Sequence, residues 1–250
     1  MNEGVFISRK DGALWLTMNR PSRANALDPA TVETLREVFS NPGDARLIVL
    51  TGAGERAFCS GADLAGEAAE ATARQFSALL QAMDACPAPI IARVNGAAAG
   101  GGVGLICAAD IAIGVTTLSI ATPEARVGLF PFMILPYLLR VSSMRTVAQM
   151  VFAGRKLSGV EAAAAGFLTS AVQPDVLDTE VERTIAAIAA MGPQAIRAGR
   201  AAYQRTALGE GLADERLMQD FIRLWDSEES KEGRAAFREK RAPVWQETAG

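Results

Sequence analysis

Short hydrophobic runs alternate with longer amphipathic segments along the first half of the chain. The runs have the length and composition of strands, and they cover residues 5–7, 14–18, 47–50, 90–94, 111–113 and 118–120. The amphipathic segments repeat apolar residues at helical spacing, and they cover residues 29–40, 67–85 and 103–109. Strand–strand–helix units therefore recur at 5–40, 47–85 and 90–109. This alternation predicts an α/β fold.

Local signals set the ends of these elements. The pair Asp11–Gly12 is typical of a hairpin turn between the first two strands. Asp28 followed by Pro29 predicts a capped helix start. The segment 58–64 is expected to be a compact loop.

The second half of the chain is predicted to be nearly all helix. Helices are expected at 132–140, 144–152 and 158–165, the last with a capping box from Ser158 to Glu161. Three or four amphipathic helices follow, from Leu177 to near Arg241. We therefore divide the chain into a core, residues 1–191, and a C-terminal helical region, residues 192–250.

Composition narrows the class of protein. The chain has 250 residues, half of them hydrophobic, and a formal charge of −3 that argues against nucleic acid as a partner. No apolar run reaches membrane-spanning length, and the first residues lack the layout of a signal peptide. Cys59, Cys86 and Cys107 are odd in number and lack metal-site spacing. Reduced thiols and a cytoplasmic location are expected.

The chain contains no histidine. Mechanisms that use Ser-His-Asp or Cys-His are therefore excluded, and so are most zinc sites. Proton transfer near neutral pH is expected to use a carboxylate.

The stretch from Ala92 to Asp110 is the most unusual part of the chain. Residues 96–102 are only glycine and alanine, and an apolar helix follows. A helix that begins in such a run points free N–H groups at whatever lies in front of it, so an anion or oxyanion site made of backbone is one interpretation. A glycine-rich turn with tight helix packing is the other. The spacing matches neither a dinucleotide fingerprint nor a P-loop.

Four spaced motifs, together with the C-terminal end, resemble those of one family. They read M-N-R-P-S-R-A-N-A-L (18–27), L-T-G-A-G-E-R-A-F-C-S-G-A-D-L (50–64), V-N-G-A-A-A-G-G-G (94–102), P-E-A-R-V-G (123–128) and E-G-R-A-A-F-R-E-K-R-A-P (232–243). Their order and spacing are similar to those of the crotonase superfamily, also called enoyl-CoA hydratase/isomerase. The resemblance covers nearly the whole chain.

This resemblance implies a spiral of strand–strand–helix repeats with a C-terminal helical region that forms a homotrimer, often a dimer of trimers. It implies an acyl-CoA thioester as substrate, with coenzyme A part of the substrate and no metal or redox cofactor. Two backbone N–H groups, of Ala62 and Gly101, would hold the thioester oxygen as it gains charge. The residues implied to surround these groups are Ala24, Ser60, Gly61, Asp63, Leu64 and Gly100. Asp63 would hold the loop that carries Ala62.

Glu124 aligns with the carboxylate that the family most often uses as acid and base. The alternative is a surface glutamate at the start of a helix next to Pro123. Walls formed by Phe130, Phe132 and Met133 would raise its pKa by desolvation.

The chain departs from the family's hydratases at Gly104, where they carry a second glutamate. Position 104 lies one helical turn beyond Gly101, so a side chain there is expected to face the thioester pocket. Phe132 also replaces a glycine of the hydratases and is expected to narrow the room for water. A single carboxylate is enough to move a double bond, so the resemblance favours isomerisation.

Two other functions stay open. One is a hydratase whose second acid comes from elsewhere, for instance Glu67 or Glu70. The other is a protein of the same fold that binds acyl-CoA or a partner without turnover. Arg23 and Lys240 stand where the family contacts the phosphates and adenine of coenzyme A, and a neighbouring subunit is a possible source of Lys240.

Overall fold

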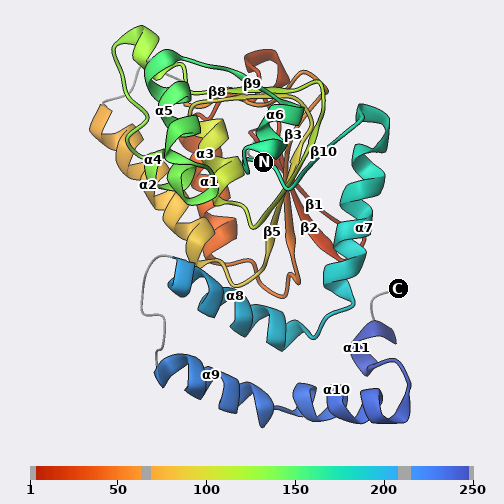
Figure 1. The fold of residues 1–250 in the computed structure, drawn as a ribbon. Coiled ribbons are helices and arrows are strands. Elements are labelled where there is room, and N and C mark those ends of the chain that lie inside the picture. Colours follow the sequence, from red (N-terminus) through yellow and green to blue (C-terminus); the bar gives the residue numbers. More distant parts are fainter. Residues whose placement is uncertain (1–3, 63–68, 208–214, 248–250) are drawn as a thin grey trace.

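A six-stranded sheet lies at the centre of the computed structural model, which describes residues 4–62, 69–207 and 215–247 (Figure 1). The strands are ordered β1-β2-β3-β5-β7-β10 across the sheet. Their bounds are Val5–Lys10, Ala13–Met18, Ile48–Gly52, Ile90–Val94, Ile111–Val115 and Ser170–Val172. Only β1 and β2 pair antiparallel, as the hairpin signal predicted. The α/β fold expected from the alternating pattern is confirmed.

A second sheet of four short strands lies beside the first. Its order is β4-β6-β8-β9, with bounds Ala57–Cys59, Ala97–Ala99, Ser119–Ala121 and Leu157–Ser158. β4 lies partly in the segment expected to be a loop, and β6 lies in the glycine- and alanine-rich run. No strand signal marks β6 in the sequence because alanine has low strand propensity, and β6 is a strand because β4 and β8 pair with it on either side.

The helices carry the predicted start signals. Asp28 accepts a hydrogen bond from the Thr31 amide at 2.8 Å and caps α1, Pro29–Ser40. The capping box of Ser158 and Glu161 is present at the start of α6, Gly159–Ala164. The other helices before the C-terminal region are α2 (Ala69–Ala85), α3 (Gly101–Ala108), α4 (Leu135–Val141), α5 (Met144–Ala153) and α7 (Leu177–Ala189). α4 begins later than expected because Pro136, which lacks an N–H, occupies its first turn.

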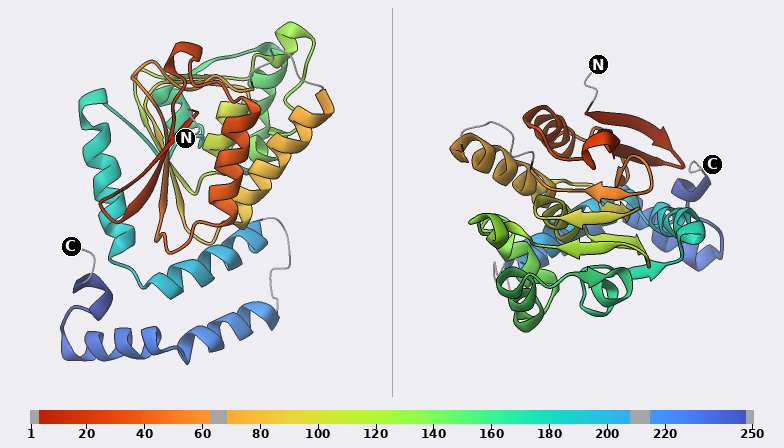
Figure 2. Two further views of the ribbon diagram at one scale, coloured as in Figure 1. Left: turned by 180° about the vertical axis from the view of Figure 1, so that it is seen from behind. Right: turned by 90° about the horizontal axis from the view of Figure 1, so that it is seen from above.

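The helices form two layers around the six-stranded sheet. Figure 2 shows α1 and α2 on one face and α7 on the other. Helix α8 (Pro193–Ala207) crosses beneath them, and α9 (Glu215–Trp225) and α10 (Glu228–Glu239) continue as an arm that ends in α11 (Val244–Glu247). Among the described helices, none is both long and apolar enough to cross a membrane.

A buried arginine attaches α8 to this core. The Arg200 guanidinium forms an ion pair of 2.7 Å with Asp110. It also donates to the backbone carbonyls of Met83 at 2.9 Å, of Asp84 at 3.1 Å and of Cys86. These carbonyls end α2, where backbone acceptors lack helical partners. Arg200 therefore satisfies the end of one helix and holds another against it.

The three cysteines are free and buried. Burial raises the pKa of the Cys59 and Cys107 thiols to about 12. These thiols therefore stay protonated and act as small apolar side chains near neutral pH.

Helix α3 approaches β4 so closely that Gly102 has no room for a side chain, which gives the first prediction. A Cβ at Gly102 would meet the Cys59 carbonyl oxygen and lie 2.9 Å from the Cys59 Cβ. We expect Gly102→Ala to lower the free energy of unfolding by about 1–3 kcal/mol or more, because backbone on both sides must shift. The matched control is Gly199→Ala in α8, where a Cβ meets nothing within 4 Å.

We expect this control to stabilise the protein by about 1 kcal/mol. Urea unfolding of both variants measures the difference. Equal stability of the two variants would contradict the close approach.

Candidate active site

Two loops from distant parts of the chain meet at the start of α3. Gly61 has a φ of 90°, and a Cβ there would lie 2.8 Å from the Ala99 oxygen and 3.0 Å from the Gly101 nitrogen. Only glycine fits this contact without strain. The contact places the segment that ends in Ala62 directly against the first turn of α3.

The two amides implied to form the oxyanion hole lie in this contact region. Gly101 is the first residue of α3, so its N–H has no partner within the helix. Within the described ranges, neither the Gly101 amide nor the Ala62 amide donates a hydrogen bond to another residue. Both donors therefore remain available to a bound molecule.

Two buried asparagines hold the turn that leads to Ala62, and sequence reasoning missed both. Asn25 donates to the Ala53 carbonyl at 3.0 Å and to the Ala57 carbonyl at 2.8 Å. Asn95 donates to the Gly54 carbonyl at 2.6 Å and accepts from the Gly52 amide at 3.2 Å. Their positions inside the 18–27 and 94–102 motifs were the available signal. Without these side chains the carbonyl of the buried residue Ala57 would lose both of its side-chain donors.

The short 3-10 helix η1, Pro21–Arg23, ends in Ala24, and this turn, which we call the Arg23 turn, lies against the same segment. The Ser60 amide donates to the Ala24 carbonyl at 3.0 Å, and the Ser60 hydroxyl donates to the Arg23 carbonyl at 3.4 Å. Ala24 adopts a left-handed conformation with a φ of 50°. The Arg23 side chain is exposed and forms no ion pair with any residue that the structure describes. It is therefore free to meet an anionic ligand beside Ser60 and Gly61.

Glu124 lies on the other side of residues 100–102 at the start of α3, which we call the glycine turn. It begins the short 3-10 helix η2, Glu124–Val127, and a Cβ at Gly100 would lie 3.0 Å from its Oε1. Its Oε2 is buried and accepts no hydrogen bond from the described part of the protein. Burial raises the pKa of this carboxyl above its usual range. These features differ from those of a solvated glutamate at a helix start.

The position of the missing second glutamate is filled. A Cβ at Gly104 would meet the Ile134 Cγ2, with the Ile134 Cβ at 3.1 Å and the Phe76 Cζ at 3.6 Å. Both side chains are buried. A side chain at 104 would therefore have to displace Ile134, whichever way it faces. Ile134 and Phe76 went unnoticed in the sequence because both fit an ordinary helical core pattern.

Phe132 does not close the site within one chain. Its ring packs on Phe130, with 5.0 Å between centroids, and its side chain is 73% exposed. Phe130 also packs on Phe152 of α5. In a single chain the Phe132 ring is therefore held at the surface by aromatic contacts, and its effect on the room for water stays a prediction. Met133 is likewise exposed.

The structure separates Lys240 from this site. Lys240 ends α10, and the chain just after it contacts the start of β3, where Arg46 donates to the Trp245 carbonyl. The Arg23 turn lies at the other end of β3, because Asn25 bonds the Ala53 carbonyl just after Gly52. Lys240 of the same chain therefore does not reach the Arg23 turn.

Glu70 is the one alternative second acid that the structure describes, and it is exposed. Glu70 lies in the first turn of α2 and forms an exposed ion pair of 2.8 Å with Arg74. Glu67, Asp63 and Leu64 lie outside the described residues. In the described ranges, no group of three histidine, cysteine, aspartate or glutamate side chains could hold a metal ion.

The chain is similar to known proteins over nearly its whole length. The chain matches the family model described as enoyl-CoA hydratase/isomerase over residues 8–248. It is 34% identical to a carnitinyl-CoA dehydratase of Salmonella typhi over 98% of this chain and 99% of that protein. It is 31% identical to the putative enoyl-CoA hydratase/isomerase YngF of Bacillus subtilis over 96% and 97% of the two chains. The solved structure of Pseudomonas aeruginosa AtuE superposes with a TM-score of 0.90 at 30% identity, covering 98% and 100%.

Proposed function

Since this chain belongs to the enoyl-CoA hydratase/isomerase family and is a crotonase-type enzyme, we propose that it moves the double bond of an enoyl-CoA thioester between the 3- and 2-positions. The observation that carries this proposal is a single half-buried carboxylate, with one oxygen buried and unpaired in the described structure, beside two backbone N–H groups that donate to no described residue. In the proposed complex, the Ala62 and Gly101 amides bind the thioester oxygen. Glu124 then lies next to the carbon chain, against Gly100.

The proposed reaction needs one acid–base group. The Glu124 carboxylate removes a proton from the α-carbon of the 3-enoyl thioester, and the electron pair moves onto the thioester oxygen. Each of the two amides stabilises that negative charge, and losing one such donor typically costs about 3–4 kcal/mol. The protonated Glu124 then returns the proton to the γ-carbon, which leaves a 2-enoyl thioester. No metal or redox cofactor enters this sequence.

Packing at Gly104 favours isomerisation over hydration. Hydration of a double bond requires a group that activates water and another that delivers a proton. Ile134 and Phe76 occupy the place from which a second carboxylate would act, and Glu70 is paired with Arg74 at the surface. Both contacts leave Glu124 as the one acid–base group that the described residues bring to the glycine turn.

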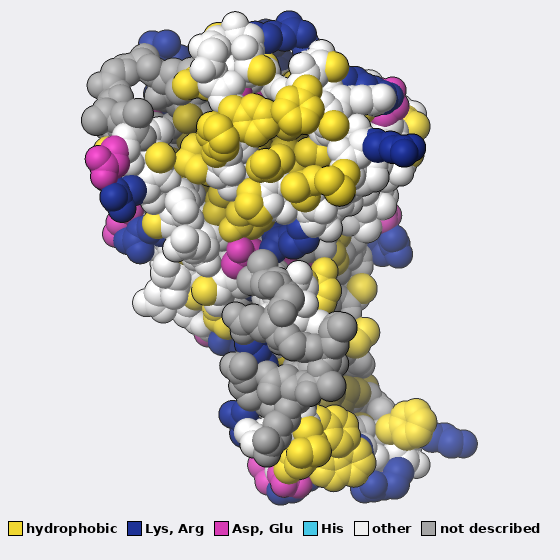
Figure 3. All heavy atoms as spheres, turned by 60° about the vertical axis from the view of Figure 1, so that its left-hand side comes forward, with side chains coloured by type: hydrophobic (Ala, Val, Ile, Leu, Met, Phe, Trp, Pro, Cys, Tyr) yellow, Lys and Arg dark blue, Asp and Glu magenta, His cyan; other side chains and the backbone are white. Residues whose placement is uncertain are grey.

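Exposed charge and apolar surface suggest how the substrate and a second copy are held. Arg23 is the cation proposed to contact the phosphates of coenzyme A. We also propose that the chain assembles as a homotrimer, as the family resemblance implies, and Figure 3 shows hydrophobic side chains in two areas of one face that such an assembly would cover. One set of exposed apolar residues lies between η2 and α5 (Val127, Leu129, Phe132, Met144 and Phe152), and the other lies on α9 (Met218, Phe221, Ile222 and Trp225). In that assembly Lys240 would serve the site of a neighbouring copy.

The mechanism predicts the effect of Glu124→Gln. We expect kcat for isomerisation of a 3-enoyl-CoA to fall by about 10²–10⁴-fold, because the proton carrier is lost while both amides remain. Affinity for a saturated acyl-CoA should stay within a few-fold. In the parent, kcat/KM should fall as the pH drops through the raised pKa of Glu124, since the carboxylate form accepts the proton. The acid midpoint should therefore lie above the ordinary glutamate pKa of 4.5.

Initial-rate assays between neutral and acidic pH measure kcat of the variant and the pH dependence of kcat/KM of the parent. Glu37→Gln, an exposed change on α1, is the control and should behave as the parent. A Glu124→Gln variant with near-parental rates would refute the mechanism. If the parent binds acyl-CoA but converts no enoyl-CoA, the function is acyl-CoA binding without turnover.

Packing around Gly104 predicts a coupled pair of substitutions. We expect Gly104→Glu alone to destabilise the fold, because its Cβ meets Ile134. Ile134→Ala alone should cost about 2–5 kcal/mol through the cavity that it leaves. Gly104→Glu with Ile134→Ala should cost less than the sum of the two, and it should gain hydration of crotonyl-CoA.

Urea unfolding and the loss of crotonyl-CoA absorbance measure this double-mutant cycle. Additive costs would show that the two residues do not share the space. Hydration by the parent at rates above its isomerisation would make the hydratase the correct function.

The assembly proposal predicts the effect of a charge on α9. Phe221→Asp should convert the trimer to smaller species, because it places a carboxylate in an apolar interface. Phe6→Asp on β1 is the matched control, since Phe6 and Phe221 are both 62% exposed. Sedimentation velocity should show the parental size for Phe6→Asp alone. Parental size for both variants would exclude α9 from the interface.

A further inference from the structure

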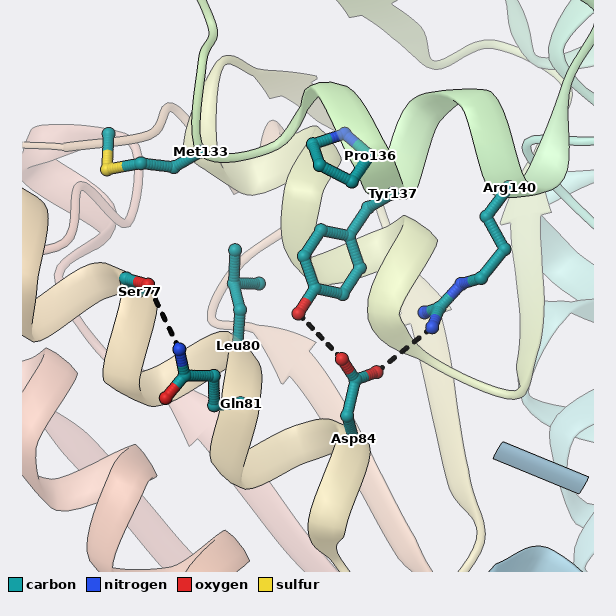
Figure 4. Close-up of a pocket in the computed structure, with 8 residues that line it drawn as sticks. All are labelled: Ser77, Leu80, Gln81, Asp84, Met133, Pro136, Tyr137 and Arg140. Carbon is teal, nitrogen blue, oxygen red and sulfur yellow. Dashed lines mark hydrogen bonds and ion pairs between the residues drawn. The ribbon is translucent and has the colours of Figure 1, made fainter. Parts of the chain in front are cut away.

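A cavity of about 270 Å³ lies between α2 and α4, outside the site described above. Figure 4 shows how its side chains are divided. Leu80, Met133 and Pro136 form apolar walls, and Asp84, Tyr137 and Arg140 form a polar floor. Neither Glu124 nor the backbone amides of the glycine turn line this cavity. We refer to it as the α2–α4 groove.

At one end of the groove, the chain neighbours of two lining residues pack on the first turn of α3. Phe76, which packs on Gly101, directly precedes Ser77 of the lining, and Ile134, which packs on Gly104, directly follows Met133. At the other end Arg140 donates to the Cys107 carbonyl in the last turn of α3 at 3.1 Å.

Helices α2, α3 and α4 therefore run in the same direction along the groove. From Ser77 to Asp84 the groove extends for about 10 Å, at a rise of about 1.5 Å per residue. A chain that starts at the Gly101 amide and enters the groove is thus led toward the polar floor.

The floor is a neutral, hydrogen-bonded cluster. The Tyr137 hydroxyl donates to Asp84 Oδ2 at 2.7 Å, and Arg140 Nη1 donates to Asp84 Oδ1 at 3.1 Å. The Arg140 guanidinium also lies 4.8 Å from the centre of the Tyr137 ring. Asp84 and Arg140 are 16% and 19% exposed, so their charges offset each other in a poorly solvated place. Burial and the Asp84 carboxylate raise the pKa of Tyr137, which stays a hydroxyl donor.

The floor keeps unused hydrogen-bonding capacity. Arg140 has five N–H groups, and its contacts with Asp84, Gln204 and Cys107 use three of them within the described residues. Each Asp84 oxygen accepts one hydrogen bond from a side chain and can accept a second. A hydroxyl or carbonyl group that reached this floor would find both a donor and an acceptor.

Charge at the end of a ligand would be unfavourable at this floor. A ligand carboxylate would compete with Asp84 for Arg140 and would place two negative charges in contact. A ligand ammonium group would compete with Arg140 for Asp84 in the same way. A purely alkyl end would leave the polar floor desolvated without new partners. A neutral polar group avoids all three costs.

We propose that the α2–α4 groove receives the acyl chain of the substrate, and that its floor selects acyl chains with a hydroxyl or carbonyl group at the far end. An extended alkyl chain advances about 1.25 Å for each carbon–carbon bond of about 1.52 Å, so about eight bonds span the roughly 10 Å from Ser77 to Asp84. This inference rests on the proposed function, because it assumes that the thioester lies at Gly101. It adds to that function the chemical class of the acyl group.

Binding of non-reacting saturated thioesters tests this inference without turnover. The probes are butanoyl-CoA, octanoyl-CoA and ω-hydroxyoctanoyl-CoA, titrated calorimetrically into the full-length protein. We expect the hydroxylated thioester to bind about fivefold to tenfold more tightly than octanoyl-CoA, as one well-placed hydrogen bond provides. Equal affinities, or tighter binding of octanoyl-CoA, would overturn the selection by the floor.

A blocking variant tests the location. Gln81 lines the groove from an exposed position of α2, so Gln81→Trp should fill the groove with little effect on folding. It should weaken binding of both eight-carbon thioesters at least tenfold and leave butanoyl-CoA within twofold. Arg183→Trp, on the exposed side of α7, is the matched control and should change none of the three. An equal loss for all three thioesters, or no loss, would place the acyl chain elsewhere.

The two proposals fail differently. If a short 3-enoyl-CoA is isomerised but the three saturated thioesters show no such pattern, the groove inference is wrong and the proposed function stands. If the binding pattern appears but no enoyl-CoA is isomerised, the proposed function is wrong and the groove still binds the acyl chain. If no thioester binds, both are wrong.

Discussion

Close contact between two stretches of backbone is the constraint on which the site depends. Gly61 and Gly101 approach so nearly that a Cβ on Gly61 would lie 3.0 Å from the Gly101 nitrogen. A side chain on Gly61 would separate the loop from the helix and move the Ala62 amide away from the Gly101 amide. The asparagine contacts behind this loop, from Asn25 and Asn95, keep the turn from relaxing. A preorganised pair of donors costs no rearrangement when charge develops on a ligand.

Burial without a partner gives Glu124 its chemical character. An exposed glutamate is ionised well below neutral pH, whereas the Glu124 carboxyl has one buried oxygen with no hydrogen-bond donor in the described structure. Desolvation disfavours the charged form, so the affinity of the group for a proton rises. A carboxylate of this kind is suited to taking a proton and giving it back. Its position beside Gly100 ties that property to the same short turn that presents the amides.

Three parallel helices connect the turn to the rest of the molecule. Phe76 of α2 and Ile134 just before α4 pack on the glycines of α3, and at the other end Arg140 and Asp84 bind each other. The apolar contacts shape the space near the thioester, and the polar contacts form the floor of the groove. Arg200 extends the polar network to α8 and so links the groove to the C-terminal arm. One set of packing contacts therefore positions the chemistry, the acyl groove and the arm.

The sequence by itself determined strands β1, β2, β3, β5, β7 and β8, helices α1, α2 and α3, the caps at Asp28 and Ser158, and the family, but it missed β4, β6, β9 and β10. Those properties depend on periodicity, on capping chemistry and on motifs that can be read locally. Only the tertiary structure decided that three alanines form β6, because partners on both sides make it a strand. It also decided that Ile134 fills the space at Gly104, that Phe132 lies at the surface, and that Lys240 ends far from Arg23. Such outcomes depend on which side chains from distant segments compete for one volume, and a linear pattern does not encode that competition in any local signal.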